Sequence, residues 1–180
     1  MTAKTTTIFR ICRTAPALGN WRGLLKKITM YSLISEISER CRLAAEKRGK
    51  DTSWLSCIYS LRDELAEYWA AKDDARETSL EAIRAAEKIQ DDTEFIEAYE
   101  KNLHNTVADE LADVLIVAAT WNASAAANNA ENFKPERDAE VMLASGAISF
   151  ICGQIGGPRE VEMLRCMVNL KMRFNELRKD

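Results

Sequence analysis

A chain of 180 residues is long enough for one domain with a sizeable buried core. Its 7 Gly and 3 Pro among many Ala, Leu, Glu, Lys and Arg residues favour an all-α fold. From Met30 onward, 19 basic residues stand against 28 acidic ones, which argues against nucleic acid as a general partner. No apolar run approaches the roughly 20 residues that span a bilayer, so no membrane span is expected.

The cysteines indicate a reducing compartment. They lie at positions 12, 41, 57, 152 and 166, are odd in number, and are never in CxxC spacing. This pattern suggests neither a disulfide framework nor a thiolate zinc site. We therefore expect reduced thiols in a cytoplasmic protein.

Residues 1–29 differ in charge from the rest of the chain, because they carry six basic residues and no acid. They have a transit-peptide resemblance but lack an apolar stretch that ends in a small-residue cleavage site. We expect a basic, disordered extension at 1–29, or an extension upstream of a natural start at Met30. A helical-bundle domain is expected at 30–180. A basic arm that contacts nucleic acid or membrane is the alternative for 1–29.

About five helices are expected after residue 29. Apolar residues recur at helical spacing from Met30 to Gly49, which is a candidate C-cap. A second helix is expected from about Trp54 to Lys72. Residues 73–104 are strongly charged, have few bulky apolar side chains, and indicate an exposed helical excursion and turn whose break the pattern does not locate.

The remaining expected helices are separated by breaker residues. A third helix is expected from about Thr93 or Asn105 to Trp121. Residues 122–138 contain several Asn residues and Pro135, which indicates a connector. A fourth helix is expected at about 137–155, and a last one from Pro158, in an N1-like position, to the C-terminus.

Two pairs of carboxylates lie at one-turn spacing on different helices. Glu64 and Glu67 form the first pair, and Glu110 and Asp113 form the second. On a helical wheel, Glu64 and Glu110 fall inside apolar stripes, and their partners fall at the edges. A core-facing ionised carboxylate without a partner is costly, so each must be protonated, paired or bound to a cation.

Either pair alone is typical of solvated acids on a helix surface. Two pairs in apolar stripes favour a shared cation, and all-oxygen ligands select a hard ion, Mg²⁺ first and Mn²⁺ as a possible substitute. The one histidine, His104, belongs to no Glu-x-x-His pair, which argues against a di-iron bundle. We expect His104 to be a surface or packing residue.

The last expected helix carries polar groups suited to phosphate. Lys171, Asn175 and Arg178 follow i, i+4, i+7 spacing and so share one face, from which the two cations can reach anionic oxygens. The alternative is an ordinary basic helix end that complements the helix dipole.

Three segments in this order, DELAE at 63–67, ELAD at 110–113 and KMRFNELR at 171–178, resemble the MazG-like all-α nucleotide pyrophosphohydrolases. The resemblance covers about residues 30–178. It implies a helical bundle of the all-alpha NTP pyrophosphatase type, assembled as a homodimer or higher homo-oligomer. It also implies an enzyme that cleaves a nucleoside triphosphate, (d)NTP, to (d)NMP and pyrophosphate through a water activated by Mg²⁺.

The resemblance also implies roles for single residues, which are taken over by position. The metal ligands would be Glu64, Glu67, Glu110 and Asp113, and Asp63 would be a further catalytic acid. The residues in contact with the triphosphate would be Lys171, Asn175 and Arg178. Trp54 and Tyr68 would stack on the base or, alternatively, pack in the core.

Two departures from the family pattern leave a second interpretation open. Asp63 stands where the family has Glu, and the 42 residues between Glu67 and Glu110 exceed those of compact members. The alternative function is a non-catalytic helical-bundle module for interaction or nucleotide sensing. The pattern names neither the base nor the sugar of the nucleotide.

Overall fold

The computed structural model describes residues 21–131, 146–151, 153–155 and 157–178, with the backbone alone at 21–31, 126–131 and 158. Every regular element in these ranges is an α-helix, which confirms the all-α class. The bounded helices are α1 (Trp21–Lys47), α2 (Trp54–Asp73), α3 (Leu80–Glu87), α4 (Asp92–Asn102), α5 (Val107–Glu131) and α7 (Pro158–Leu177). Residues 146–151 and 153–154 are also helical.

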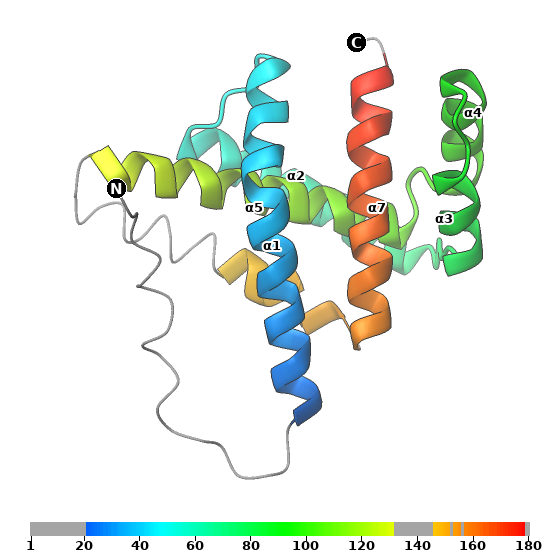
Figure 1. Ribbon diagram of the computed structural model, residues 1–180, viewed down its shortest axis with the longest axis horizontal. Helices are drawn as coiled ribbons and strands as arrows, with labels where there is room; N and C mark the ends of the chain where they lie inside the picture. Colours follow the sequence, from blue (N-terminus) through cyan, green and yellow to red (C-terminus); the bar gives the residue numbers. More distant parts are fainter. Residues whose placement is uncertain (1–20, 132–145, 152, 156, 179–180) are drawn as a thin grey trace, which may run out of the picture.

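Helix α5 is the centre of the bundle. It packs against α1, α2 and α7, and Figure 1 shows it crossing behind α1 and α7, which stand side by side. Ala112, Leu115 and Ala119 on α5 are fully buried, since helices cover it on several sides. Any acid on the inner faces of α5 is therefore carried into the core.

The connection between α1 and α2 is a tight turn built on Gly49. This residue has a φ of 67°, which a glycine adopts without steric cost, and its N–H donates to the carbonyl of Glu46 at 2.9 Å. The N–H of Lys50 donates to the carbonyl of Ala45 at 3.0 Å, which completes the paired bonds of a Schellman motif. Gly49 is thus the predicted C-cap, and the turn directs the chain to α2.

The acidic stretch after α2 is helical with turns, as expected, but it packs on the bundle, so the expectation of a wholly exposed excursion is wrong. It folds into α3 and α4, whose first turns are capped by the side chains of Ser79 and Asp91. Both helices pack against α7, where Ile83, Phe95 and Tyr99 are fully buried. Its bulky apolar residues are few, but helical spacing gathers them on the faces that meet α7.

The chain breaks between α4 and α5 at residues 103–106. Asn105 has a φ of 59°, and the hydroxyl of Thr106 donates to the carbonyl of Leu103 at 2.7 Å. Of the two expected starts for the next helix, the later one is close to the observed start at Val107. This turn brings the first residues of α5 beside α4.

Two helix boundaries differ from those expected. Helix α1 begins at Trp21, so the expected division at residue 30 lies inside a helix, and residues 1–20 are outside the described ranges. Helix α5 continues to Glu131 instead of ending at Trp121, so the expected connector at 122–138 is wrong over its first ten residues. The alanines at 123 and 125–127 are strong helix formers, and Ala125 packs with Trp121 and Cys57.

The last helix begins as predicted, with Pro158 at its first position after Gly157. Within the described residues, Cys41, Cys57 and Cys166 are buried, free thiols. None of the helices in these ranges is both long and apolar enough to cross a membrane.

Candidate functional site

A polar pocket of about 290 Å³ lies where α2, α5 and α7 meet. Both connections that flank these helices, at Lys50 and at His104, reach its rim. All four predicted metal ligands and all three predicted phosphate-contacting residues line it. The full lining is Lys50, Glu64, Glu67, His104, Asn105, Glu110, Asp113, Lys171, Asn175 and Arg178.

Three carboxylates in this pocket are close enough to share one ion. One oxygen each from Glu64, Glu67 and Glu110 lies within 4.8 Å of the others. Oxygens on opposite sides of a Mg²⁺ ion, each at about 2.1 Å from it, are about 4.2 Å apart, so a small side-chain movement suffices. Helical spacing aligns Glu64 with Glu67, and packing of α5 on α2 adds Glu110.

Glu110 provides a second, independent observation that favours a cation site at this cluster. Its side chain is only 3% exposed, and its Oε2 has no hydrogen-bond partner among the described residues. Buried polar atoms are nearly always satisfied, because an unmade bond costs free energy. An orphaned carboxylate oxygen beside two more carboxylates therefore fits a cation.

Asp113, the fourth predicted ligand, is engaged differently. Its Oδ2 lies 2.5 Å from the Nζ of Lys171, which also lies 3.1 Å from Oδ2 of Asp109. Lys171 is 6% exposed, so this is a buried ion pair. Lys171, predicted as a phosphate-contacting residue, therefore contacts two acids directly.

More acidic than basic side chains line the pocket, and Glu110 and Lys171 among them are buried. Burial raises the pKa of Glu64 to about 7, helped by the charges of Asp113 and Glu67. Burial, with the charges of Asp109 and Asp113, likewise raises the pKa of Glu110 to about 7. A proton or a metal cation at these carboxylates would relieve the repulsion.

The ion pair with Lys171 is affected by the same burial. Burial raises the pKa of Asp113 to about 6, although the Lys171 charge acts against this. For Lys171, burial lowers the pKa, but the charges of Asp113 and Asp109 outweigh it, and the net pKa is raised. Lys171 is therefore a permanent cation in the pocket at neutral pH.

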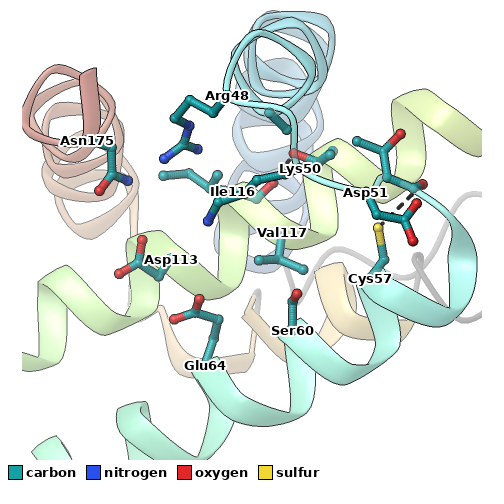
Figure 2. Close-up of a pocket in the computed structure, with 13 residues that line it drawn as sticks. Arg48, Lys50, Asp51, Cys57, Ser60, Glu64, Asp113, Ile116, Val117 and Asn175 are labelled. Atoms are coloured by element: carbon teal, nitrogen blue, oxygen red, sulfur yellow. Dashed lines mark hydrogen bonds between the residues drawn. The ribbon is translucent and has the colours of Figure 1, made fainter. Parts of the chain in front are cut away.

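A second cavity of about 80 Å³ adjoins the first and shares Lys50, Glu64, Asp113 and Asn175 with it. Figure 2 shows Glu64 on α2 and Asp113 on α5 facing each other, with Asn175 on α7 and Arg48 at the end of α1 on the far side. Ile116 and Val117 give this cavity an apolar wall. The cavity thus joins a small, partly apolar space to the acidic pocket.

Three predicted site residues lie outside both cavities. Asp63 is exposed and forms an ion pair with Arg62 at 2.7 Å. Trp54 is 48% exposed at the start of α2. Tyr68 is buried and donates to Oε1 of Gln154 at 3.1 Å, so the packing alternative applies to it.

Sequence reasoning missed Lys50, Asn105 and Asp109. Asp109 is visible in the sequence as the first residue of DELAD, next to the predicted ligand Glu110, and that neighbourhood could have flagged it. Lys50 and Asn105 reach the pocket through the geometry of two turns, for which the sequence holds no periodic signal. His104 was expected at the surface or in packing; it lines the pocket and also packs on Phe174, with ring centroids 5.6 Å apart.

Comparison of the chain with protein-family models, with curated proteins and with solved structures found no match.

Proposed function

We propose that this protein is a Mg²⁺-dependent nucleoside triphosphate pyrophosphohydrolase, which cleaves a (d)NTP to (d)NMP and pyrophosphate. The observation that carries the proposal is the orphaned, buried Oε2 of Glu110 inside a trio of carboxylates. Lys171, Asn175 and Arg178 line the same pocket, so groups for a cation and groups for phosphate oxygens occur together. The MazG-like motifs point to the same activity.

The chain's own residues divide the work in this proposal. Glu64, Glu67 and Glu110 would hold the ion, and Asp113 lines the same pocket but is paired with Lys171. A bound Mg²⁺ supplies charge neutralisation at the phosphates and lowers the pKa of water. Lys171 and Arg178 would oppose the charge that develops on the leaving pyrophosphate, and the Asn175 amide would donate to a phosphate oxygen.

The base that accepts the proton from the attacking water is best sought within the pocket. Asp63, the acid that the family pattern suggests for an outer role, is exposed and paired with Arg62. The carboxylates of Glu64 and Glu67 lie in the pocket itself. The nucleoside would extend toward the adjoining cavity, which shares Asp113 and Asn175 with the phosphate pocket.

The test is hydrolysis of a panel of eight NTPs and dNTPs by the purified chain with Mg²⁺, with products separated by chromatography. We expect a nucleoside monophosphate and pyrophosphate from at least one of them, and none when Mg²⁺ is removed by chelation. Absence of release from every nucleotide by folded protein would overturn the proposal. Formation of a diphosphate and inorganic phosphate would place the cleavage at the wrong bond.

A second candidate function is a non-catalytic helical module that senses nucleotides. Two ion pairs favour it, because each engages an acid predicted for catalysis. Asp63 pairs with Arg62 outside the pocket, and Asp113 pairs with Lys171. Calorimetry with Mg²⁺ and a non-hydrolysable triphosphate, together with the panel, separates the candidates. A sensor binds without turnover, and a plain interaction module binds neither.

We also propose that the chain forms a homodimer. Leu55, Tyr59 and Trp69 on α2 are 47%, 52% and 46% exposed, and Arg62 and Ala66 between them are exposed as well. Their positions alternate by four and three residues along the helix, which is the spacing of a helix-pairing seam. A second copy of α2 presents the same surface and could cover it.

A further inference from the structure

We propose that Tyr99 and Asp109 are positioning residues for Lys171, and that the acidic stretch between α2 and α5 is thereby part of the site. The inference rests on the proposed function for the role of Lys171 toward phosphate. The contacts that hold Lys171 are independent of that role.

Asp109 is held in place by hydrogen bonds from residues other than Lys171. It is fully buried, and its Oδ1 accepts a hydrogen bond from the Tyr99 hydroxyl. Its Oδ2 accepts from the backbone N–H of Asn105 at 2.9 Å and lies 3.1 Å from Nζ of Lys171. Because groups other than Lys171 hydrogen-bond to both oxygens, the orientation of the carboxylate does not depend on the lysine alone.

Tyr99 links Asp109 to the helix that carries the lysine. Its ring is fully buried and stacks on Phe174, with centroids 4.4 Å apart and planes 14° from parallel. Phe174 lies three residues after Lys171, so the stack and the lysine are on neighbouring turns of α7. Tyr99 therefore fixes Asp109 and the helix of the lysine at once.

A second contact holds α7 against the same stretch. The Arg173 guanidinium donates to the carbonyls of Ile89 and Gln90 at 2.6 and 3.0 Å and to Asp92 at 2.7 Å. The end of α3 and the start of α4 are thus tied to α7 as well. The acidic stretch thus holds α7 through Arg173 as well as through the ring stack on Phe174.

Asp109 and Asp113, the two acids that contact Lys171, have different roles. Asp113 lines the pocket with the carboxylate trio, whereas Asp109 does not line it. A ligand that draws Asp113 away leaves Asp109 as the counter-ion of Lys171. The ammonium then keeps its place in the pocket while one of its two partners changes.

The first experiment measures the position of Lys171 without any enzymatic assay. The full-length chain is treated briefly with acetic anhydride, and acetylation of Lys171 is followed by peptide mass spectrometry in Tyr99→Phe and Asp109→Asn. Asp73→Asn and Glu97→Gln, at exposed residues on α2 and α4, are the matched controls. We expect a rise of at least about threefold in Tyr99→Phe, more in Asp109→Asn, and none in the controls. A wild-type rate in both test variants, with the helical content intact, overturns the inference.

The second experiment asks whether Tyr99 acts through Lys171 during turnover. A double-mutant cycle compares kcat for Tyr99→Phe, Lys171→Gln and the double variant. We expect Tyr99→Phe alone to lower kcat by about tenfold, the effect of one hydrogen bond to a charged group, and to add nothing in the Lys171→Gln background. A purely structural role would give independent losses in the cycle and would overturn the inference. If the wild-type chain hydrolyses no nucleotide, the proposed function fails, and the acetylation result decides the inference by itself.

Discussion

The Nζ of Lys171 lies 2.5 Å from Oδ2 of Asp113, so a lysine already neutralises one of the predicted metal ligands. In the neighbouring trio, one oxygen each from Glu64, Glu67 and Glu110 lies within 4.8 Å of the others. The pocket thus contains one acid paired with a lysine and one cluster of acids whose mutual repulsion a cation would relieve. This division sets the expectations below.

Replacement of Glu110 by Gln should abolish Mg²⁺-dependent turnover while the helical content stays unchanged. The substitution removes one charge from the trio, and the orphaned oxygen loses its value as a ligand. Mg²⁺ should raise the thermal midpoint of the wild-type chain but not that of Glu110→Gln, as measured by circular dichroism. Glu97→Gln on the exposed face of α4 is the control and should behave as wild type. Full activity of Glu110→Gln would remove the metal assignment.

The metal-free chain should lose stability as the pH rises from about 4.5 through about 7. Burial raises the folded-state pKa of Glu64 and of Glu110 to about 7, so these groups bind more protons in the folded state than in the unfolded state. Their contribution is present below the unfolded pKa and is lost as the pH passes the folded pKa. Urea unfolding at a series of pH values, with chelator present, measures the slope of the free energy of unfolding against pH. Glu64→Gln should flatten it, and an unchanged slope would contradict the pKa shifts.

Replacement of Lys171 by Met should lower the free energy of unfolding at pH 8 by about 3 kcal/mol, because it leaves Asp109 and Asp113 buried without their cation. Arg62→Met breaks an exposed ion pair with Asp63, and its cost should stay below about 1 kcal/mol. Chemical denaturation of both variants gives the comparison. Equal losses would mean that the Lys171 pair is no more important to stability than a surface contact.

The double substitution Tyr59→Glu and Trp69→Glu should convert a dimer into a monomer without loss of helical content. Both side chains are exposed on α2, and a charge at each position would repel the same charge on a second copy. Sedimentation velocity of both proteins gives the oligomeric state. A variant that sediments as the wild type does would exclude this face as the interface.

Spacing along single helices determined much of the site in advance. Glu64 with Glu67, and Lys171 with Asn175, share faces because the helix repeats every 3.6 residues, and all four line one pocket. Arg178 also lines the pocket, but it follows the end of α7 and has an extended backbone, so the helical repeat does not place it there. The positions of the Gly49 turn and of Pro158 at the start of α7 also follow from local backbone preferences. Such features depend only on neighbours in the chain.

The acidic stretch shows where local patterns fail. Its charge suggested exposure, but Phe95 and Tyr99 are buried because α7 offers them an apolar surface. Helix α5 continues past Asn122 because its alanines favour a helix and because Ala125 packs with Trp121 and with Cys57 on α2. Tertiary contacts outweighed the local charge in the acidic stretch and reinforced the local helix preference in α5.

The sequence by itself determined which acids and cations share a helix face, because the helical repeat is a property of the local backbone. Only the tertiary structure decided that Glu110 joins Glu64 and Glu67, that Asp113 pairs with Lys171, and that Tyr99 reaches Asp109. These partners lie on different helices, and their distances depend on how the helices cross. Crossing geometry is set by side-chain packing over the whole core, which no spacing within one helix encodes.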